Sequence, residues 1–389
     1  MRVPGRAERG AILIWAVLGL VAIGALMALS LNVGRVVSVR GGLQNGADGA
    51  ALAGAAEFDG QLTGLARAPE AATAVAGRHQ TDSGQAVTLD PGDVELGAWD
   101  RAARQFTPIT GRTPADQRLI NAVRVRDGRE AARGNAVPVV FGGAFLGPRS
   151  LDVRAGAVAV GGGPCQDKCA FPAALADCML IGADGGLRCE DRFFVLNSDW
   201  QDNLGLTSLV PGVAASVPNI KDALGRCVDS SAYQPIPISN GNPLQPVSKD
   251  PFFRRLPIEV SAPVVHVERC EPAQYQKCQQ AGPNDPCLNA KFVGDLPVWG
   301  YVTVKICYVT GSVVKAWPPA DWPAGDADCG AAPGLATFPG VDPSQWPDPF
   351  LKHTLFMKHK CYTEQPGNQS GVGGCGFFGT YTTRSRLVE

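Results

Sequence analysis

The residue type best suited to chemistry in this chain of 389 residues is cysteine. All twelve cysteines follow residue 164, in a region rich in proline and in loop-forming residues. An even number of cysteines in such a region is typical of a disulfide framework, and disulfides persist only in oxidising compartments. We therefore expect this region to lie outside the cytoplasm, with the pairing left open. The candidate disulfide cysteines are Cys165, Cys169, Cys178, Cys189, Cys227, Cys270, Cys278, Cys287, Cys307, Cys329, Cys361 and Cys375.

Metal binding is the alternative use of these cysteines, and their spacing argues against it. Zinc ligands usually come as two closely spaced pairs, whereas Cys165 and Cys169 have no matching second pair. The chain has four histidines, of which His353 and His359 lie near Cys361. We expect no metal site and no cofactor.

Motifs for catalysis are missing as well. GVGGCG at 371–376 fits G-x-G-x-x-G by letter, but only residues 377–389 follow it, too few for the helix and the acidic residue that a dinucleotide site needs. G-x-S-x-G, H-E-x-x-H and P-loop motifs do not occur. DSSAY at 229–233 ends in Tyr233, where a metal-dependent adhesion motif requires serine. The sequence predicts no enzyme, and it identifies no small-molecule substrate.

Composition narrows the class of protein further. Apolar residues make up 45% of the chain and charged residues 18%, which is typical of globular domains. The net charge is -1, and no block of lysine and arginine with interleaved aromatic residues is present. Because the electrostatic footprint of a nucleic-acid binder is missing, we expect no nucleic acid among the partners.

The N-terminus carries a run of uncharged apolar residues, AILIWAVLGLVAIGALMALSL at 11–31. As a helix this run is roughly 31 Å long, which matches one hydrocarbon core. Arg2, Arg6 and Arg9 precede it, which predicts a cytoplasmic N-terminus. A cleaved signal peptide stays open as an alternative, with Ala28 and Ser30 before the cut, but the run exceeds the usual apolar length of about 7 to 15 residues.

The helical pattern continues beyond the apolar run. Its apolar and small residues recur on one stripe, formed by Val36, Leu43, Ala47, Ala50 and Gly54. Glycines between them weaken the helix by about 1 kcal/mol each, yet small residues also let another backbone approach closely. The stripe is therefore predicted to pack against another helix, the alternative being a low-complexity Ala/Gly helix without a packing role.

Downstream, the pattern indicates a second helix from Pro69 to about His79 and then short strands. The apolar stretch VPVVFGGAFLG at 137–147 is too short to span a membrane and is expected in a core. Before GGGP at 161–164 the chain has no lysine and no cysteine, which suggests a domain boundary. The expected strands are 87–89, 94–99, 122–126, 151–160, 263–270 and 298–311.

These observations predict an α+β protein: a long N-terminal transmembrane helix that continues out of the membrane on the non-cytoplasmic side, then a β-rich domain and a disulfide-rich β/loop domain. The expected divisions are a cytoplasmic tip (1–10), a transmembrane helix (11–31), a juxtamembrane helix (32–56), an α+β domain (57–160), which the resemblance described next places in the periplasm, and a cysteine-rich β/loop domain (165–389).

The stretch ERGAILIW at 8–15, the apolar run and LNVGRVVSVRGGLQNGADGAALAGA at 31–55 together resemble a known family. They are similar to the N-terminal segment of the TadG-like proteins of bacterial tight-adherence (Tad, or Flp) pilus assembly systems. Asn32 stands where that family has Asp, and Gly46 and Gly49 replace alanines. The residues of the family motif and the helix packing face are Val33, Gly34, Arg35, Val36, Leu43, Gln44, Asn45, Ala47, Asp48, Ala50, Ala51, Leu52 and Gly54.

The resemblance extends to Val160 and leaves residues 165–389 uncovered, so their role stays open. It implies a non-enzymatic, single-pass protein of the bacterial inner membrane, with its N-terminus in the cytoplasm and its C-terminal region in the periplasm. Such a protein acts as an assembly or accessory component of the pilus, with other Tad components as partners through helix packing. The alternative is a membrane-anchored adhesin or ligand-binding protein.

Overall fold

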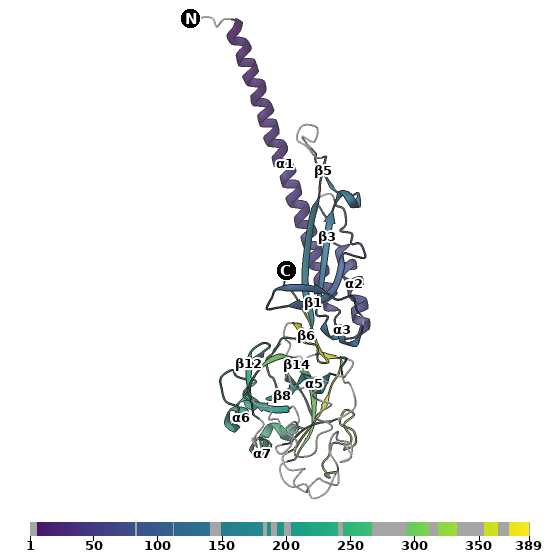
Figure 1. Cartoon of the computed structure of the whole chain (residues 1–389), viewed down its shortest axis with the longest axis vertical. Helices are drawn as coiled ribbons and strands as arrows, with labels where there is room; N and C mark the ends of the chain where they lie inside the picture. Colours follow the sequence, from purple (N-terminus) through teal and green to yellow (C-terminus); the bar gives the residue numbers. More distant parts are fainter. Residues whose placement is uncertain are drawn as a thin grey trace.

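The computed structural model covers the whole chain, and one helix dominates its shape (Figure 1). Helix α1 (Arg6–Ala56) is a rod whose first half stands clear of a body made of two parts. The first part packs along the second half of α1, and the second part lies beyond it. We describe residues 6–81, 84–111, 113–140, 149–181, 185–187, 193–197, 204–239, 244–266, 294–310, 318–332, 354–364 and 373–388.

Helix α2 (Leu62–Ala76) begins earlier than the sequence indicated. Pro69, expected at the first turn, lies inside the helix and removes one backbone hydrogen bond. Leu65 and Ala68, on the extra turns, are buried in the same core as α1, so burial of apolar surface offsets that loss. The shorter helices are α3 (Pro114–Leu119), η1 (Ala131–Arg133), α5 (Asp177–Leu180), α6 (Val217–Arg226), α7 (Leu244–Val247) and η2 (Pro251–Arg255).

The first sheet lies against α1 and α2 and has the order β16-β18-β6-β3-β1-β2, with β17 also paired to β6. The expected strands at 94–99, 122–126 and 151–160 correspond to β1, β3 and β5 with β6, whereas residues 87–89 form no named strand. The strands of this sheet are β1 (Val94–Asp100), β2 (Gln105–Pro108), β3 (Ala122–Arg129), β6 (Val153–Pro164), β16 (Thr363–Glu364), β17 (Gly373–Cys375) and β18 (Thr380–Leu387).

Strand β6 crosses the position where composition suggested a domain boundary. GGGP at 161–164 is the end of this strand, and it pairs with β17 and β18 from the C-terminus of the chain. Ser385 on β18 also donates a hydrogen bond from its hydroxyl to the carbonyl of Leu52 on α1, at 3.2 Å. The chain therefore leaves the first part and returns to complete its sheet, an arrangement that sequence composition does not reveal.

The second sheet has the order β12-β10-β8-β13-β14-β15-β9, and an extra pairing of β12 with β14 closes part of it into a ring. The length of β14 allows this closure, because its first residues pair with β12 and its middle pairs with β13. Its interior holds buried residues such as Ile236, Val298 and Tyr301. The strands are β8 (Ala173–Ala176), β9 (Phe193–Asn197), β10 (Leu204–Thr207), β12 (Pro235–Ser239), β13 (Ile258–Val265), β14 (Gly294–Val309) and β15 (Thr354–His359).

Two small antiparallel pairs of strands are separate from these sheets in the described structure, namely β4 (Val137–Pro138) with β5 (Ser150–Leu151), and β7 (Gln166–Asp167) with β11 (Ser230–Ser231). The first contains the start of the apolar stretch at 137–147. Val137 is buried as expected, but Val140 is 55% exposed, and residues 141–147 lie outside the described residues.

Adjacent glycines on α1 give a matched test of how closely the helix is packed. A Cβ at Gly42 would lie 2.9 Å from the carbonyl oxygen of Gln80, whereas nothing lies within 4 Å of one at Gly41. Gly41→Ala should stabilise the full chain by up to about 1 kcal/mol through helix propensity. Gly42→Ala should destabilise it by about 1–3 kcal/mol because backbone must shift. Thermal unfolding in detergent measures both, and equal effects would contradict this packing.

Candidate functional site: the two faces of helix α1

The first half of α1 presents apolar side chains on all sides. In the described part of the chain, one helix, α1, is long and apolar enough to cross a membrane. Trp15, Leu20 and Leu26 are 74%, 70% and 64% exposed. So much contiguous apolar surface is unfavourable in water and is matched by the interior of a bilayer. This half of the helix fits a single-pass membrane anchor.

The second half of α1 has a buried face that corresponds to the stripe expected from the sequence. Leu43, Ala47 and Ala50 are at most 2% exposed, and they share a core with α2, β3 and β6. A Cβ at Gly54 would lie 3.1 Å from the carbonyl oxygen of Ala68 on α2, so glycine permits close contact of the two helices. The stripe packs against a helix, but the helix and the sheet that cover it belong to the same chain.

Polar residues of the motif fix the position of α1 on the sheet. The Gln44 amide donates to Asp48 Oδ1 at 2.7 Å and to the carbonyl of Gly156 on β6 at 3.0 Å. One turn after the apolar run, Arg35 donates from Nη1 to the carbonyl of Pro138 at 3.4 Å. These bonds set the register between the helix and strands β4 and β6.

Between the apolar run and the packed stretch, one side of α1 is open, from Val33 to Asn45. Val33 and Val37, one turn apart, are 52% and 64% exposed. At Gly34 and Gly41, none of the described heavy atoms of the rest of the protein lies within 4 Å of the position that a Cβ would occupy. In the described part of the chain, the motif residues therefore divide between a face that holds the body and an open side with Val33, Gly34 and Asn45, where Val37, Arg40 and Gly41 are also exposed.

A buried carboxylate lies beneath the packed face. Asp127 on β3 is 4% exposed and accepts a hydrogen bond from the Gly128 amide at 2.7 Å, while its Oδ2 has no hydrogen-bond partner among the described residues. It lines a cavity of about 40 Å³ with Leu43 of α1 and with Thr81 and Asn135. Burial raises the pKa of Asp127 to about 6, and the nearby carboxylate of Asp93 adds to the effect.

Comparison with protein families matches the region built around α1. Residues 10–57 match the family model of TadE/G-like Flp pilus-assembly proteins, and residues 53–159 match that of Tad-like Flp pilus-assembly proteins. Residues 10–159 of this chain are therefore similar to the Tad pilus-assembly families. Comparison with curated proteins and with solved structures found no match. The prediction of a Tad relationship to Val160 is confirmed, and it gives the protein a pilus-related role.

Disulfides link segments of the region beyond residue 164 to one another, and one of them lies where β6 leaves the residues that match the Tad families. Cys165, directly after β6, pairs with Cys375 on β17 across 210 residues of sequence. Cys169 pairs with Cys227 and Cys307 with Cys329, and Cys361 is also disulfide-bonded. The other candidates lie in segments or side chains outside the described part, namely Cys178, Cys189, Cys270, Cys278 and Cys287.

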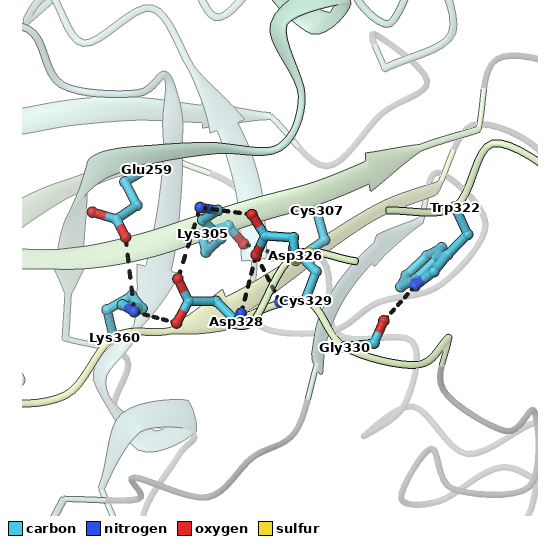
Figure 2. The surroundings of a disulfide bond; sticks show 9 residues. All are labelled: Glu259, Lys305, Cys307, Trp322, Asp326, Asp328, Cys329, Gly330 and Lys360. Carbon is cyan, nitrogen blue, oxygen red and sulfur yellow. Dashed lines mark hydrogen bonds and ion pairs between the residues drawn. A yellow bond between two sulfur atoms is a disulfide. The ribbon is translucent and has the colours of Figure 1, made fainter. Parts of the chain in front are cut away.

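One disulfide holds a proline-rich surface loop against β14. The described part of this loop comprises residues 318–332. Figure 2 shows its Cys329 beside Cys307 of the strand, and these two cysteines form the disulfide. Lys305 lies 3.2 Å from Asp326, and Lys360 pairs with Asp328, whose hydrogen bond raises the pKa of the Lys360 ammonium (Figure 2).

The same loop has an aromatic base. Trp322 is 8% exposed, donates from its indole to the Gly330 carbonyl at 2.9 Å, and contacts Phe356 edge to face (Figure 2 shows the hydrogen bond). Tyr308 donates to Asp321 Oδ1 at 2.6 Å. Covalent, ionic and aromatic contacts together make this loop a fixed feature of the surface.

Among the described residues, the arrangement most similar to catalytic groups is an aspartate beside a histidine. The two residues lie far apart in the sequence, so their spacing gave no signal. Asp177 Oδ2 and His266 Nδ1 are 2.7 Å apart although 89 residues separate them, and the imidazole stacks on Trp299. Hydrolytic sites use such pairs together with a nucleophile at hydrogen-bond distance from the imidazole. The pair lies at the end of β13, in the part of the chain beyond the residues that match the Tad families.

The buried carboxylate gives a pH-dependent prediction for stability. Because the folded state raises the pKa of Asp127 from 3.8 to about 6, ionisation above that pH opposes folding, and stability is lost as the pH rises through 6. Asp127→Asn should therefore match the native protein near pH 4 and exceed it at pH 8 by at most about 3 kcal/mol. Urea unfolding of the full chain, with disulfides intact, measures this. A difference that does not vary with pH would contradict it.

Proposed function

We propose that this protein is a non-enzymatic assembly or accessory component of a bacterial Tad/Flp-type pilus, anchored in the inner membrane by residues 11–31. The observation that carries the proposal is the match of residues 10–159 to the Tad families, on a helix whose first half is bare and apolar. In this proposal the N-terminus is cytoplasmic and residues 57–389 are periplasmic.

The division of α1 into two faces supports a specific mode of action. The buried face is occupied by the protein's own sheet and second helix, so contacts with other Tad components fall to the open face. Val33 and Val37 lie on that face, next to the glycines at 34 and 41 that allow a second helix to approach closely. This is a more specific surface than the stripe that the sequence indicated.

The region beyond residue 164 supports the proposed compartment. Three of its disulfides connect described elements, and such bonds persist in the periplasm but not in the cytoplasm. Its strands β17 and β18 return to the Tad domain, so we propose that both parts act as one periplasmic body carried by α1.

The topology is tested by thiol labelling of the full chain in intact cells. After mild reduction, a maleimide that does not cross the inner membrane should label cysteines once the outer membrane is permeabilised, and the protein should resist extraction by alkaline carbonate. Both results follow from an anchor with oxidised cysteines on its outer side. Labelling that requires lysis of the inner membrane, or release by carbonate, would contradict the proposed topology.

A charged side chain at position 37 tests whether the open face of α1 contacts other Tad components. Val37→Lys should reduce co-isolation with other Tad components at least about tenfold, since burying a lysine in a helix contact costs more than 1.4 kcal/mol. Pilus number and attachment should fall with it. Ala47 and Ala50 are unsuitable positions for this purpose, because they are fully buried within the chain and larger side chains there would disturb folding.

Val213→Lys is the matched control for this experiment. Val213 is an exposed valine of the second part, 38% exposed, so its replacement should leave co-isolation and pili unchanged. Normal pili with Val37→Lys would contradict the proposed role of the open face. If cells that lack the whole protein still made normal pili but no longer attached to surfaces, the result would instead favour a membrane-anchored adhesin.

A further inference from the structure

The β4–β5 pair lies beside α1 where the apolar run of the helix ends. Val137 pairs with Leu151, and the amide of Val139 donates to the carbonyl of Arg149 at 2.9 Å. Figure 1 shows β5 at the end of the body nearest the bare half of α1. The pair is therefore the part of the body closest to the proposed anchor.

Two hydrogen bonds fix the level of this pair along the helix. The amide of Val140 donates to Asn32 Oδ1 at 3.1 Å, and Arg35 Nη1 donates to the Pro138 carbonyl at 3.4 Å. Asn32 follows directly after Leu31, the last residue of the apolar run. When residues 11–31 fill the hydrocarbon core, Val140 must lie at its boundary.

The exposed surface at this level is apolar. Val140 is 55% exposed, and Leu31, the last residue of the apolar run, is 58% exposed. The sequence at 139–147, VVFGGAFLG, carries no charge, and Arg149, where the strand returns, is exposed. An apolar stretch followed by a cationic residue is the pattern of segments that lie in the interface of a bilayer.

We propose that the β4–β5 pair rests on the periplasmic surface of the membrane, with Val140 in contact with lipid acyl chains. Lipid is the occupant because α1 fixes this surface at the boundary of the hydrocarbon core, where acyl chains are already present. The contact gives the protein a second attachment beside its single helix, which restricts rotation and tilt of the body. The inference rests on the proposed anchoring of α1.

Site-specific photocrosslinking of the full chain tests this contact. The chain is reconstituted into vesicles of phosphatidylethanolamine and phosphatidylglycerol, with Val140→p-benzoylphenylalanine, and lipid adducts are counted by mass spectrometry. Val140 should give at least about tenfold more lipid adducts than the same substitution at Val213, as expected for a residue in the interface. Leu20→p-benzoylphenylalanine, inside the apolar run, reports on the anchor itself.

The two reference positions separate the possible failures. Adducts at Leu20 without adducts at Val140 would overturn the inference while leaving the anchor intact, and a lack of adducts at Leu20 would overturn the anchor. Adducts of Val140 with protein in place of lipid would overturn the choice of lipid. Adducts at Val140 that vanish in pure phosphatidylcholine would assign the contact to head-group charge and Arg149, against an apolar contact.

Discussion

The close approach of α1 to its own sheet is the contact on which the rest of this structure depends. A Cβ at Gly161 of β6 would lie 2.1 Å from the carbonyl oxygen of Ala55, so strand and helix meet backbone to backbone. Alanines and glycines on α1 leave room for this contact, and only the glycines lower the helix propensity. Burial against α2, β3 and β6 supplies the stability that the isolated helix lacks. The helix is thereby continuous from the membrane into the core of the body.

This continuity couples the second part of the body to the anchor. Strand β18 contacts α1 and pairs with β6, and the Cys165–Cys375 disulfide closes the same junction covalently. Strand β6, a central strand of the first sheet, thus joins the residues that match the Tad families to those beyond them. Removing the later residues would leave part of the first sheet unpaired.

Local patterns predicted the features that local physics controls. The length of the apolar run predicted the membrane-spanning half of α1, and the helical periodicity after it predicted the buried stripe. The alternation of apolar and polar residues predicted β1, β3 and much of β14. Long-range features were not predictable in this way. Pro69 was interpreted as a helix start because its local effect is to block a hydrogen bond, yet tertiary burial of Leu65 overrides it. The return of β18, the ring closure at β12 and the pairing of Asp177 with His266 join residues whose separation leaves no local signal.

The stripe shows what a helical pattern leaves open about its packing partner. Periodicity reports that a face is covered, but it does not say whether the cover is another chain or a later segment of the same one. Here the segment after α1 folds back as α2, and β3 and β6 fill the remaining surface, so every buried position of the stripe is accounted for within the chain. What remains for a partner is the side on which Val33 and Val37 are exposed and no local segment returns. In a helix that both anchors and packs, the surface for assembly is defined by what the protein's own fold leaves uncovered.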